Sequence, residues 1–286
     1  MTRHGTVPAL TNRVKQQALA CGFDAVGITP ATVLEPERER YLRWIEEGRQ
    51  GQMRWIDSTW AERSADPRTL LPEARSVICV ALSYHSRPLG QRPAGYGRMA
   101  RYAWTRDYHQ VVGEKLARLC STLADLGGRS RPFVDTAPAM DKALATRAGI
   151  GWQSKNTNVL SRRWGSFTYL GGVVTDLELL PDRPAQDGCG RCTACVRACP
   201  TGALKGDYTI DARLCISYLT IEHRGPIPRE LRPLMGAWVV GCDICQDVCP
   251  VVTDLQDRDF PVARELRVQA TREAFRESPA RPSETG

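Results

Sequence analysis

The sequence lacks any long apolar run. No stretch of its 286 residues approaches the ~18 consecutive apolar residues of a membrane-spanning helix. The opening residues, MTRHGTVPALTNRVKQQ, contain neither the apolar segment of a secretory signal nor a twin-arginine export signal. Apart from two related cysteine motifs, no segment repeats. These absences argue against a membrane-spanning or exported protein and predict a cytoplasmic location.

The overall composition is that of a folded protein, with 42% hydrophobic and 25% charged residues. The length favours two domains, one of them large enough to bury a sizeable core. The net charge of +7 is a mild basic excess. It suits a polyanionic partner such as nucleic acid, but a solvated arginine-rich surface explains it equally well. We expect a monomer.

The N-terminal part of the chain predicts helices alternating with strands. Residues 75–84 are apolar and β-branched and predict a buried strand. A helix is expected to open at Pro138, and residues 165–179 are expected to form a pair of strands. Helical periodicity marks residues 11–20, 35–51 and 107–128. This order of elements predicts an α/β or α+β layer architecture.

A stretch rich in proline and aspartate, LLPDRPAQDG at 179–188, is the expected domain boundary. We therefore predict an α/β domain over residues 1–180 and a cysteine-rich domain over residues 181–252. Residues 253–286 form a short charged tail, and its end, RESPARPSETG, has the composition of a disordered segment.

Eleven cysteines are unlikely disulfide partners in a cytoplasmic chain, because that compartment keeps thiols reduced. Three of them, Cys21, Cys79 and Cys120, lie apart in apolar segments and are expected to fill the core. The other eight crowd into residues 189–249, which points to metal binding.

The spacing of these eight cysteines is that of a protein with two [4Fe–4S] clusters. CGRCTACVRACP at 189–200 and CDICQDVCP at 242–250 both end in C-x3-C-P, and in two-cluster ferredoxins the cysteine before the proline binds the other cluster. Cluster one is therefore assigned to Cys189, Cys192, Cys195 and Cys249. Cluster two is assigned to Cys199, Cys242, Cys245 and the remaining nearby cysteine, Cys215.

Structural zinc is the competing interpretation, but paired C-x2-C motifs suffice for zinc and the C-x3-C-P endings do not belong to it. Two adjacent clusters provide a path for single electrons between a donor and a buried acceptor. The upstream residues are therefore expected to hold either a redox active site or a partner surface.

Several separated motifs in one order resemble a known family. They include DPRTLLPEARSVICVALSY, RYAWTRDYH, VDTAPAMDKALATRAGIGWQSKNT and GSFTYLGGVVTDLEL, followed by the cysteine motifs and DARLCISYLTIEHRGPIPRELRPLMG. Over residues 60–252 the chain is similar to the epoxyqueuosine reductases, cobalamin-dependent iron–sulfur enzymes that complete queuosine in tRNA. A lone cysteine between the two runs, here Cys215, also matches the family.

The resemblance implies a nitroreductase-like domain that holds base-off cobalamin, akin to reductive dehalogenases, followed by a bacterial ferredoxin-like domain with two [4Fe–4S] clusters. An external donor such as a flavodoxin or ferredoxin system would supply electrons. In the family, cob(I)alamin attacks the epoxide-bearing ring, a carboxylic acid donates a proton as the C–O bond breaks, and loss of water leaves an alkene.

The resemblance also implies catalytic residues. Asp135 matches the proton donor and is counted among the cobalamin contacts, and a carboxyl with a raised pKa in an apolar, closed site could act so. Asp107, Tyr108 and His109 match an active-site segment. The alternatives are structural: Asp135 could cap the helix after Pro138, and the other three could begin a helix.

Further corrin contacts are implied for Arg63, Ser217 and the segments 155–159 and 169–172. Glycines 171 and 172 suit close approach of the backbone to a flat macrocycle, although a β-bulge would explain them nearly as well. The individual residues expected at the corrin are Arg63, Asn158, Val159, Leu170, Gly171 and Ser217.

The sequence departs from the family in places. The family continues after its last cysteine with helical repeats that grip tRNA, whereas 37 residues follow Cys249 here, so the chain reads as a shortened member. Thr105 and Ser154 stand where the family has glycine. Basic residues of one loop could contact tRNA phosphates instead, although exposed arginines are often only solvated: Arg224, Arg229 and Arg232.

These departures leave two alternative functions. The first is a cobalamin and iron–sulfur reductase acting on a small molecule, either a free nucleoside or a halogenated compound. The second is an electron-transfer or cobalamin-handling protein without turnover of its own. A carrier has no need of a positioned acid, so Asp135 distinguishes it from a reductase.

Overall fold

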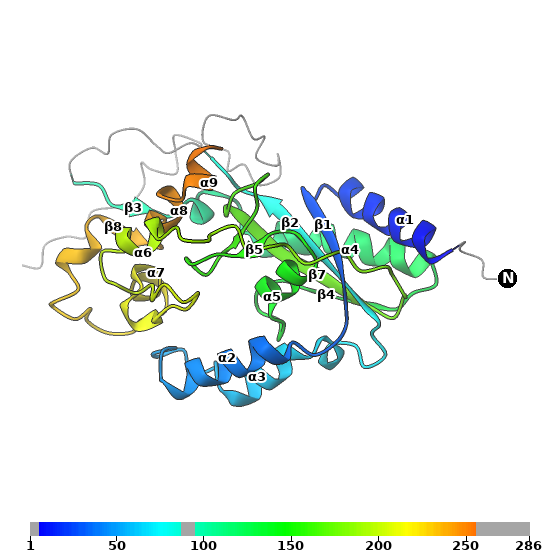
Figure 1. Ribbon diagram of the computed structural model, residues 1–286, viewed down its shortest axis with the longest axis horizontal. Helices are drawn as coiled ribbons and strands as arrows, with labels where there is room; N and C mark the ends of the chain where they lie inside the picture. The colour runs from blue at the N-terminus through cyan, green and yellow to red at the C-terminus, as the bar shows by residue number, and fades with distance from the viewer. Residues whose placement is uncertain (1–5, 87–94, 256–286) are drawn as a thin grey trace, which may run out of the picture.

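The computed structural model describes residues 6–86 and 95–255, and its centre is a four-stranded sheet in the order β1-β2-β7-β4 (Figure 1). Every neighbouring pair in this sheet is antiparallel. The mixed fold is confirmed, and the antiparallel sheet makes it α+β rather than α/β. The four strands are β1 (Ala25–Pro30), β2 (Ser76–Ser83), β4 (Ser130–Phe133) and β7 (Thr168–Thr175).

Strand β2 is buried along its whole length because helices cover both faces of the sheet. Its alternate side chains serve two cores. Ile78 and Val80 pack with α1 (Val7–Ala20) and α4 (Tyr108–Asp125) on one face. Val77 and Cys79 pack on the other face with residues of α5 (Asp141–Arg147). This continuous burial explains why the sequence reads as an unbroken apolar run.

Strand β7 is one long strand, so the pair of strands predicted over residues 165–179 is wrong. Its two glycines sit in regular register, with Gly171 opposite Val80 and Gly172 opposite Cys79, so they form no bulge. A Cβ on Gly172 would lie 2.6 Å from the carbonyl oxygen of Ile78. These glycines therefore let neighbouring strands and helices pack closely against β7.

Helices α2 (Glu35–Glu46) and α3 (Ser58–Ala65) pair beside the sheet, along the lower edge of Figure 1. The helix predicted over residues 35–51 is shorter than expected and ends at Glu46. The sequence analysis did not predict α3. The loop between them is tied to the cysteine-rich region, because the Tyr218 hydroxyl accepts a 2.7 Å hydrogen bond from the Gln52 backbone N–H.

The cysteine-rich elements gather at the end of the molecule opposite α1 (Figure 1). They are joined to the rest of the chain by a parallel pairing of β3 (Arg98–Met99) with β8 (Trp238–Val240). Buried Arg101 adds an ion pair to Asp247 at 2.6 Å and accounts for the polar link between the two parts. The helices of this region are α6 (Ala194–Ala198), α7 (Ile216–Ile221), α8 (Ile244–Asp247) and α9 (Pro250–Thr253).

Short elements complete the described part of the chain. Two brief strands, β5 (Trp152–Gln153) and β6 (Val159–Leu160), form a hairpin around residues 154–158. The 3-10 turns are η1 (Pro67–Thr69), η2 (Arg101–Trp104), η3 (Ala212–Leu214) and η4 (Pro233–Met235). No helix among the described residues is long and apolar enough to cross a membrane. The expectation of a disordered end falls on residues 256–286, outside the described residues.

Candidate functional site: two cysteine sets and a carboxylate–imidazole cluster

The eight cysteines lie close enough for their charges to act on one another, mostly within two groups, although Cys195 also acts on Cys245. The charges of Cys249, Cys189 and Cys192 act on Cys195. The charges of Cys215 and Cys199 act on Cys242, whose pKa is raised to about 12, chiefly by burial. These effects are compatible with the two ligand sets predicted from spacing, and the assignment of each cysteine to a cluster stays a prediction. Buried thiols with raised pKa values need a compensating positive charge to ionise, and iron supplies it.

Helix α6 separates the two sets. Cys195 lies within this single turn of helix and Cys199 directly after it, so one short element contributes to both sets. No group of three or more ligand side chains among the described residues is close enough to hold a single metal ion. A [4Fe–4S] cluster takes four thiolates, and the paired C-x3-C-P endings favour it over zinc.

The hairpin loop of residues 154–158 holds both cysteine loops in place. The Lys155 Nζ donates to the carbonyl oxygens of Gly190 at 2.7 Å and Cys192 at 3.0 Å. The Asn156 side-chain amide donates to the Cys245 carbonyl at 3.1 Å. Lys155 and Asn156 were expected along the corrin, but the structure assigns these two side chains to the cluster loops.

Trp152 touches a cluster ligand directly. Its indole N–H donates to the Cys189 sulfur at 3.5 Å, and a Cβ on the neighbouring Gly188 would lie 2.6 Å from the indole ring. Hydrogen bonds to ligand sulfurs are among the factors that set cluster potentials. Trp152 therefore couples cluster one to the first part of the chain.

In the wild type, the N–H···S bond from Trp152 stabilises the reduced cluster, which carries more negative charge than the oxidised one. Trp152→Phe removes this bond and is therefore expected to lower the reduction potential of cluster one. A redox titration of the reconstituted protein, followed by electron paramagnetic resonance, measures this potential. Trp44→Phe is the matched control, since the Trp44 indole donates to the Ile210 carbonyl and to no sulfur. Equal potentials in wild type and Trp152→Phe would contradict the prediction.

The candidate acid, Asp135, lies just after β4 and receives two hydrogen bonds on one oxygen. Its Oδ2 accepts from the Tyr108 hydroxyl and pairs with His109 Nε2, each at 2.9 Å. Asp135 has φ +48, a left-handed backbone conformation that is costly for a residue other than glycine. Such a conformation at a polar cluster points to a functional constraint on where the carboxyl is aimed.

His109 joins two carboxylates. Its Nδ1 lies 2.8 Å from Asp107 Oδ1, and its Nε2 lies 2.9 Å from Asp135 Oδ2. Partial burial opposes protonation of the ring, but the hydrogen bonds to Asp135 and Asp107 outweigh it and raise the His109 pKa. The bond from His109 lowers the pKa of Asp107. Both ring nitrogens are engaged, so this imidazole is placed to carry a proton.

The ring of Tyr108 is held by stacking. It lies parallel to the Tyr169 ring, with centroids 4.4 Å apart and an interplanar angle of 5°. Tyr169 in turn stacks on Tyr84 and donates its hydroxyl to the Tyr102 carbonyl at 2.7 Å. Burial, followed by the negative charge of Asp135, raises the Tyr108 pKa, so this residue remains a hydrogen-bond donor.

The structural alternative for Asp135 is wrong. Helix α5 begins at Asp141, and its N-cap position is Met140. The helix therefore starts later than Pro138, where the sequence placed it, and Asp135 is not its cap. Asp107, by contrast, does cap α4, because its carboxylate accepts from the His109 backbone N–H at 2.9 Å.

The apolar, closed surrounding expected for Asp135 is not found, since 53% of its side chain is exposed. Asp141 is the neighbouring carboxyl, and its pKa is raised by burial and by the charge of Asp135. Lys142 opposes this effect, donates to Asn158 Oδ1 at 3.5 Å, and its charge acts on Cys215. Lys142 therefore lies between the Asp135 cluster and cluster two.

The residues expected at the corrin are placed as follows. Arg63 is exposed in the last turn of α3, next to Ser64, whose carbonyl accepts from the Met140 backbone N–H of the Asp135 loop. Ser217 lies in α7 just after Cys215, and Asn158 and Val159 begin the second half of the hairpin. Leu170 and Gly171 lie within β7, where the space beside Gly171 is occupied by Phe133 and Val112.

Sequence reasoning missed Trp152 and Lys142, which the structure brings to the site. Tyr169 and Lys155 lay in segments expected along the corrin, but their side chains stack on Tyr108 and hold a cysteine loop, respectively. A polar Ser-Lys-Asn run inside an otherwise apolar segment was a usable signal for Lys155. Nothing local marked Trp152, because aromatic residues in strands are usually core residues.

Two family models match the chain. Residues 64–136 match the model described as "Epoxyqueuosine reductase QueG, DUF1730". Residues 188–252 match the model "4Fe-4S double cluster binding domain". The first range contains the Asp107–Asp135 cluster, and the second contains all eight cysteines, so both parts of the site fall within matched segments.

Curated relatives extend the match to most of the chain. Epoxyqueuosine reductase of Cellulophaga algicola is 40% identical over 241 residues, which cover 83% of this chain and 77% of the relative. Epoxyqueuosine reductase of Escherichia coli K12 is 42% identical over 249 residues, covering 84% of this chain and 65% of the relative.

Solved structures agree. An epoxyqueuosine reductase with an epoxyqueuosine-modified tRNA-Tyr stem loop matches with a TM-score of 0.81 and 34% identity, covering 90% of this chain and 68% of that one. The Bacillus subtilis enzyme, with its catalytic aspartate loop swung out of the active site, matches with a TM-score of 0.80 and 33% identity over the same shares. A reductive dehalogenase, at 14% identity and a TM-score of 0.56, shares the fold alone.

Fold and site together define an oxidoreductase in which a double-cluster iron–sulfur domain adjoins a carboxylate–imidazole proton site. Its cofactors include two [4Fe–4S] clusters, and the matched double-cluster domain of residues 188–252 contains eight cysteines. Within that class, the chain belongs to the epoxyqueuosine reductase family.

Proposed function

We propose that this protein reduces epoxyqueuosine to queuosine in tRNA. The observation that carries the proposal is the cluster of Asp135, Tyr108 and His109, which lies beside the double-cluster domain in a chain of this family. The net reaction takes two electrons and two protons, converts the epoxide to an alkene and releases water. A protein that only carried electrons would not need an aimed carboxyl.

The chain's own residues account for the proton delivery. Asp135, in its protonated form, donates to the epoxide oxygen as the C–O bond breaks. His109, whose pKa is raised, returns a proton to Asp135 through the 2.9 Å contact. Asp107 keeps the imidazole oriented, and Tyr108 holds the Asp135 carboxyl from the other side. The half-exposed Asp135 is accessible to a substrate.

Base-off cobalamin, when bound, would supply the nucleophile that attacks the epoxide-bearing ring. The donor set near Asp135 suits this group. Asn158 and Arg63 offer amide and guanidinium groups to the amides and phosphate of cobalamin, and His109 has both nitrogens committed to carboxylates, in keeping with a base-off form. The proposed contacts are Arg63, Asp135, Asn158, Val159, Leu170, Gly171 and Ser217, with Gly171 acting through its backbone.

We further propose the cellular setting. An external flavodoxin or ferredoxin system feeds the clusters, and the protein works as a monomer in the cytoplasm. The cobalamin domain spans residues 1–180 and the cluster domain residues 181–252. Exposed Arg224 and Arg229 contact tRNA phosphates, and Gln52 steadies this loop by accepting from the Arg224 backbone N–H at 2.6 Å.

Mass spectrometry of tRNA from a strain lacking this protein tests the function. Epoxyqueuosine is expected to replace queuosine at the wobble position, because the proposed reaction is the step that removes the epoxide oxygen. Re-expression of the wild-type chain restores queuosine, and Asp135→Asn does not. Normal queuosine in the deletion strain would contradict the proposal and favour reduction of a free nucleoside or another small molecule.

A further inference from the structure

Cluster one has an exposed side. Of the eight cluster cysteines, Cys192 alone is exposed, and the others are partly buried. Its neighbours Arg191 and Thr193 are exposed as well. Because electron transfer slows steeply with distance, a protein donor that reduces the clusters has its shortest approach over this loop.

Cluster two lies on the inner side of the path. Lys142, in the first turn of the helix that follows the Asp135 loop, donates to Asn158 at 3.5 Å, in the same hairpin loop as Asn156. The carbonyl of the cluster-two ligand Cys245 is held by buried Asn156. Electrons that enter over Cys192 therefore pass from cluster one to cluster two and then toward the site of reduction.

The surface around Cys192 is basic. Arg191 lies in the cluster loop, and Arg197 follows Cys195 in α6; both are exposed. Exposed Arg162 places its guanidinium carbon 5.6 Å from the centre of the Trp152 ring, and that indole contacts the Cys189 sulfur. We call Arg162, Arg191 and Arg197 the basic face.

The acidic groups nearby do not cancel this charge. Asp187, the carboxyl of the cluster-one loop, accepts from the Tyr208 hydroxyl at 2.6 Å and from the Cys189 backbone N–H at 2.9 Å. Lys155, buried beneath the same loop, donates to the carbonyl oxygens of Gly190 and Cys192 and adds a positive charge there. Asp187 is thus engaged by the Tyr208 hydroxyl and a backbone N–H, and the three guanidinium groups of the basic face are exposed.

We propose that the basic face binds an acidic one-electron carrier protein, which reduces cluster one directly. This inference rests on the proposed function, whose reaction consumes two electrons for each epoxide. In each encounter the carrier loses one electron and cluster one gains it, so two encounters support one turnover. Charge complementarity at the rim of such a contact acts mainly on the association rate and on its dependence on salt.

Stopped-flow reduction of the reconstituted full chain by reduced flavodoxin, an acidic carrier, tests the proposal. The loss of visible cluster absorbance gives the rate. The double variant Arg191→Glu/Arg197→Glu is expected to react about tenfold more slowly at low ionic strength. Arg13→Glu, which reverses one exposed charge on α1 at the far end of the molecule, is expected to leave the rate unchanged.

Three outcomes decide the matter. Dithionite, a small reductant, should reduce wild type and the double variant equally, which shows that the clusters are intact. The wild-type rate with flavodoxin should fall as salt is added, and a rate independent of salt would overturn the proposal without any variant. Slowing by Leu234→Glu but not by the double variant would also overturn it, because the donor would then use the shallow groove beside cluster two, lined by Pro200, Leu234 and Ile244.

Failure of this proposal is distinct from failure of the proposed function. Suppose that dithionite supports conversion of epoxyqueuosine in tRNA, but flavodoxin reduces wild type and the double variant at the same rate. Then only the proposed docking surface is wrong. If wild type fails to convert epoxyqueuosine with either reductant, the function is wrong.

Discussion

Asp135→Asn is expected to lower turnover of epoxyqueuosine tRNA by about 10²–10⁴-fold, the range that general acid catalysis contributes. Asparagine keeps the size of the side chain and accepts a hydrogen bond from Tyr108, but it cannot donate the proton that breaks the C–O bond. Single-turnover conversion of modified tRNA, measured by mass spectrometry, gives the rate.

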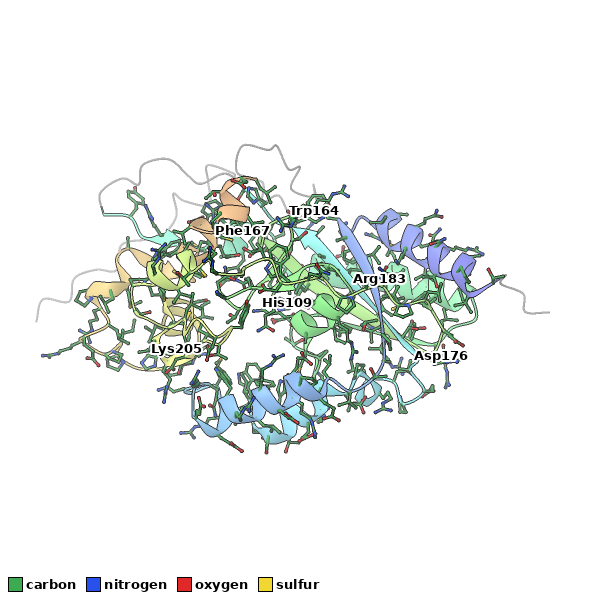
Figure 2. All side chains as sticks on the ribbon, in the orientation of Figure 1. His109, Trp164, Phe167, Asp176, Arg183 and Lys205 are labelled. Atoms are coloured by element: carbon green, nitrogen blue, oxygen red, sulfur yellow. The ribbon has the colours of Figure 1, made fainter. Side chains whose placement is uncertain are left out.

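Two controls separate chemistry from folding. The variant should take up iron and be reduced by dithionite like wild type, since Asp135 contacts no cysteine. Asp176→Asn is the matched carboxylate control, because Asp176 pairs with Arg129 far from His109 (Figure 2). Turnover of Asp135→Asn within about threefold of wild type would contradict the general-acid role, because acid catalysis contributes about 10² or more.

Cys215→Ala is expected to reduce the iron content from about eight to about four atoms per chain, because two [4Fe–4S] clusters need eight thiolates and cluster two would keep three. Its position supports the assignment. Cys215 caps α7 and its charge acts on Cys242 and Cys245, although it stands apart from both cysteine motifs in the sequence. Iron analysis after anaerobic reconstitution measures the change.

Cys120→Ala is the matched control, because this half-buried cysteine of α4 belongs to neither set and should leave about eight irons. Cys189→Ala should lose the other cluster and retain cluster two. If Cys215→Ala kept its full iron content, the fourth ligand of cluster two would have to come from another residue.

The cysteine sets could be predicted from the sequence because most of their geometry is local. Three ligands of cluster one lie within seven residues, and the exchange of Cys199 and Cys249 follows from the C-x3-C-P spacing. Cys215 was then assigned to cluster two because it is the one remaining cysteine near the two motifs. The structure brings these same residues together, as the mutual effects on their pKa values indicate.

The roles of the glycines and of the 154–158 loop could not be predicted. Gly172 looked suited to a macrocycle or a bulge, but its Cβ position is occupied by Ile78 and Phe133 from two neighbouring strands. Lys155 looked like a corrin contact, but its ammonium holds a cysteine loop 35 residues further along. Both roles depend on partners that are distant in sequence, so no local pattern encodes them.

The sequence by itself determined the metal chemistry, the helix that begins after Asp107 and the apolar strands, because each depends on residues within a few positions of one another. Only the tertiary structure decided which side chains contact the carboxyl group of Asp135. Tyr108 and His109 reach Asp135 across 27 and 26 residues because α4 packs beside β4, which places the start of the helix at the end of the strand. The resemblance pointed to Asp135, and the packing of α4 against the sheet surrounds it with a hydroxyl and an imidazole.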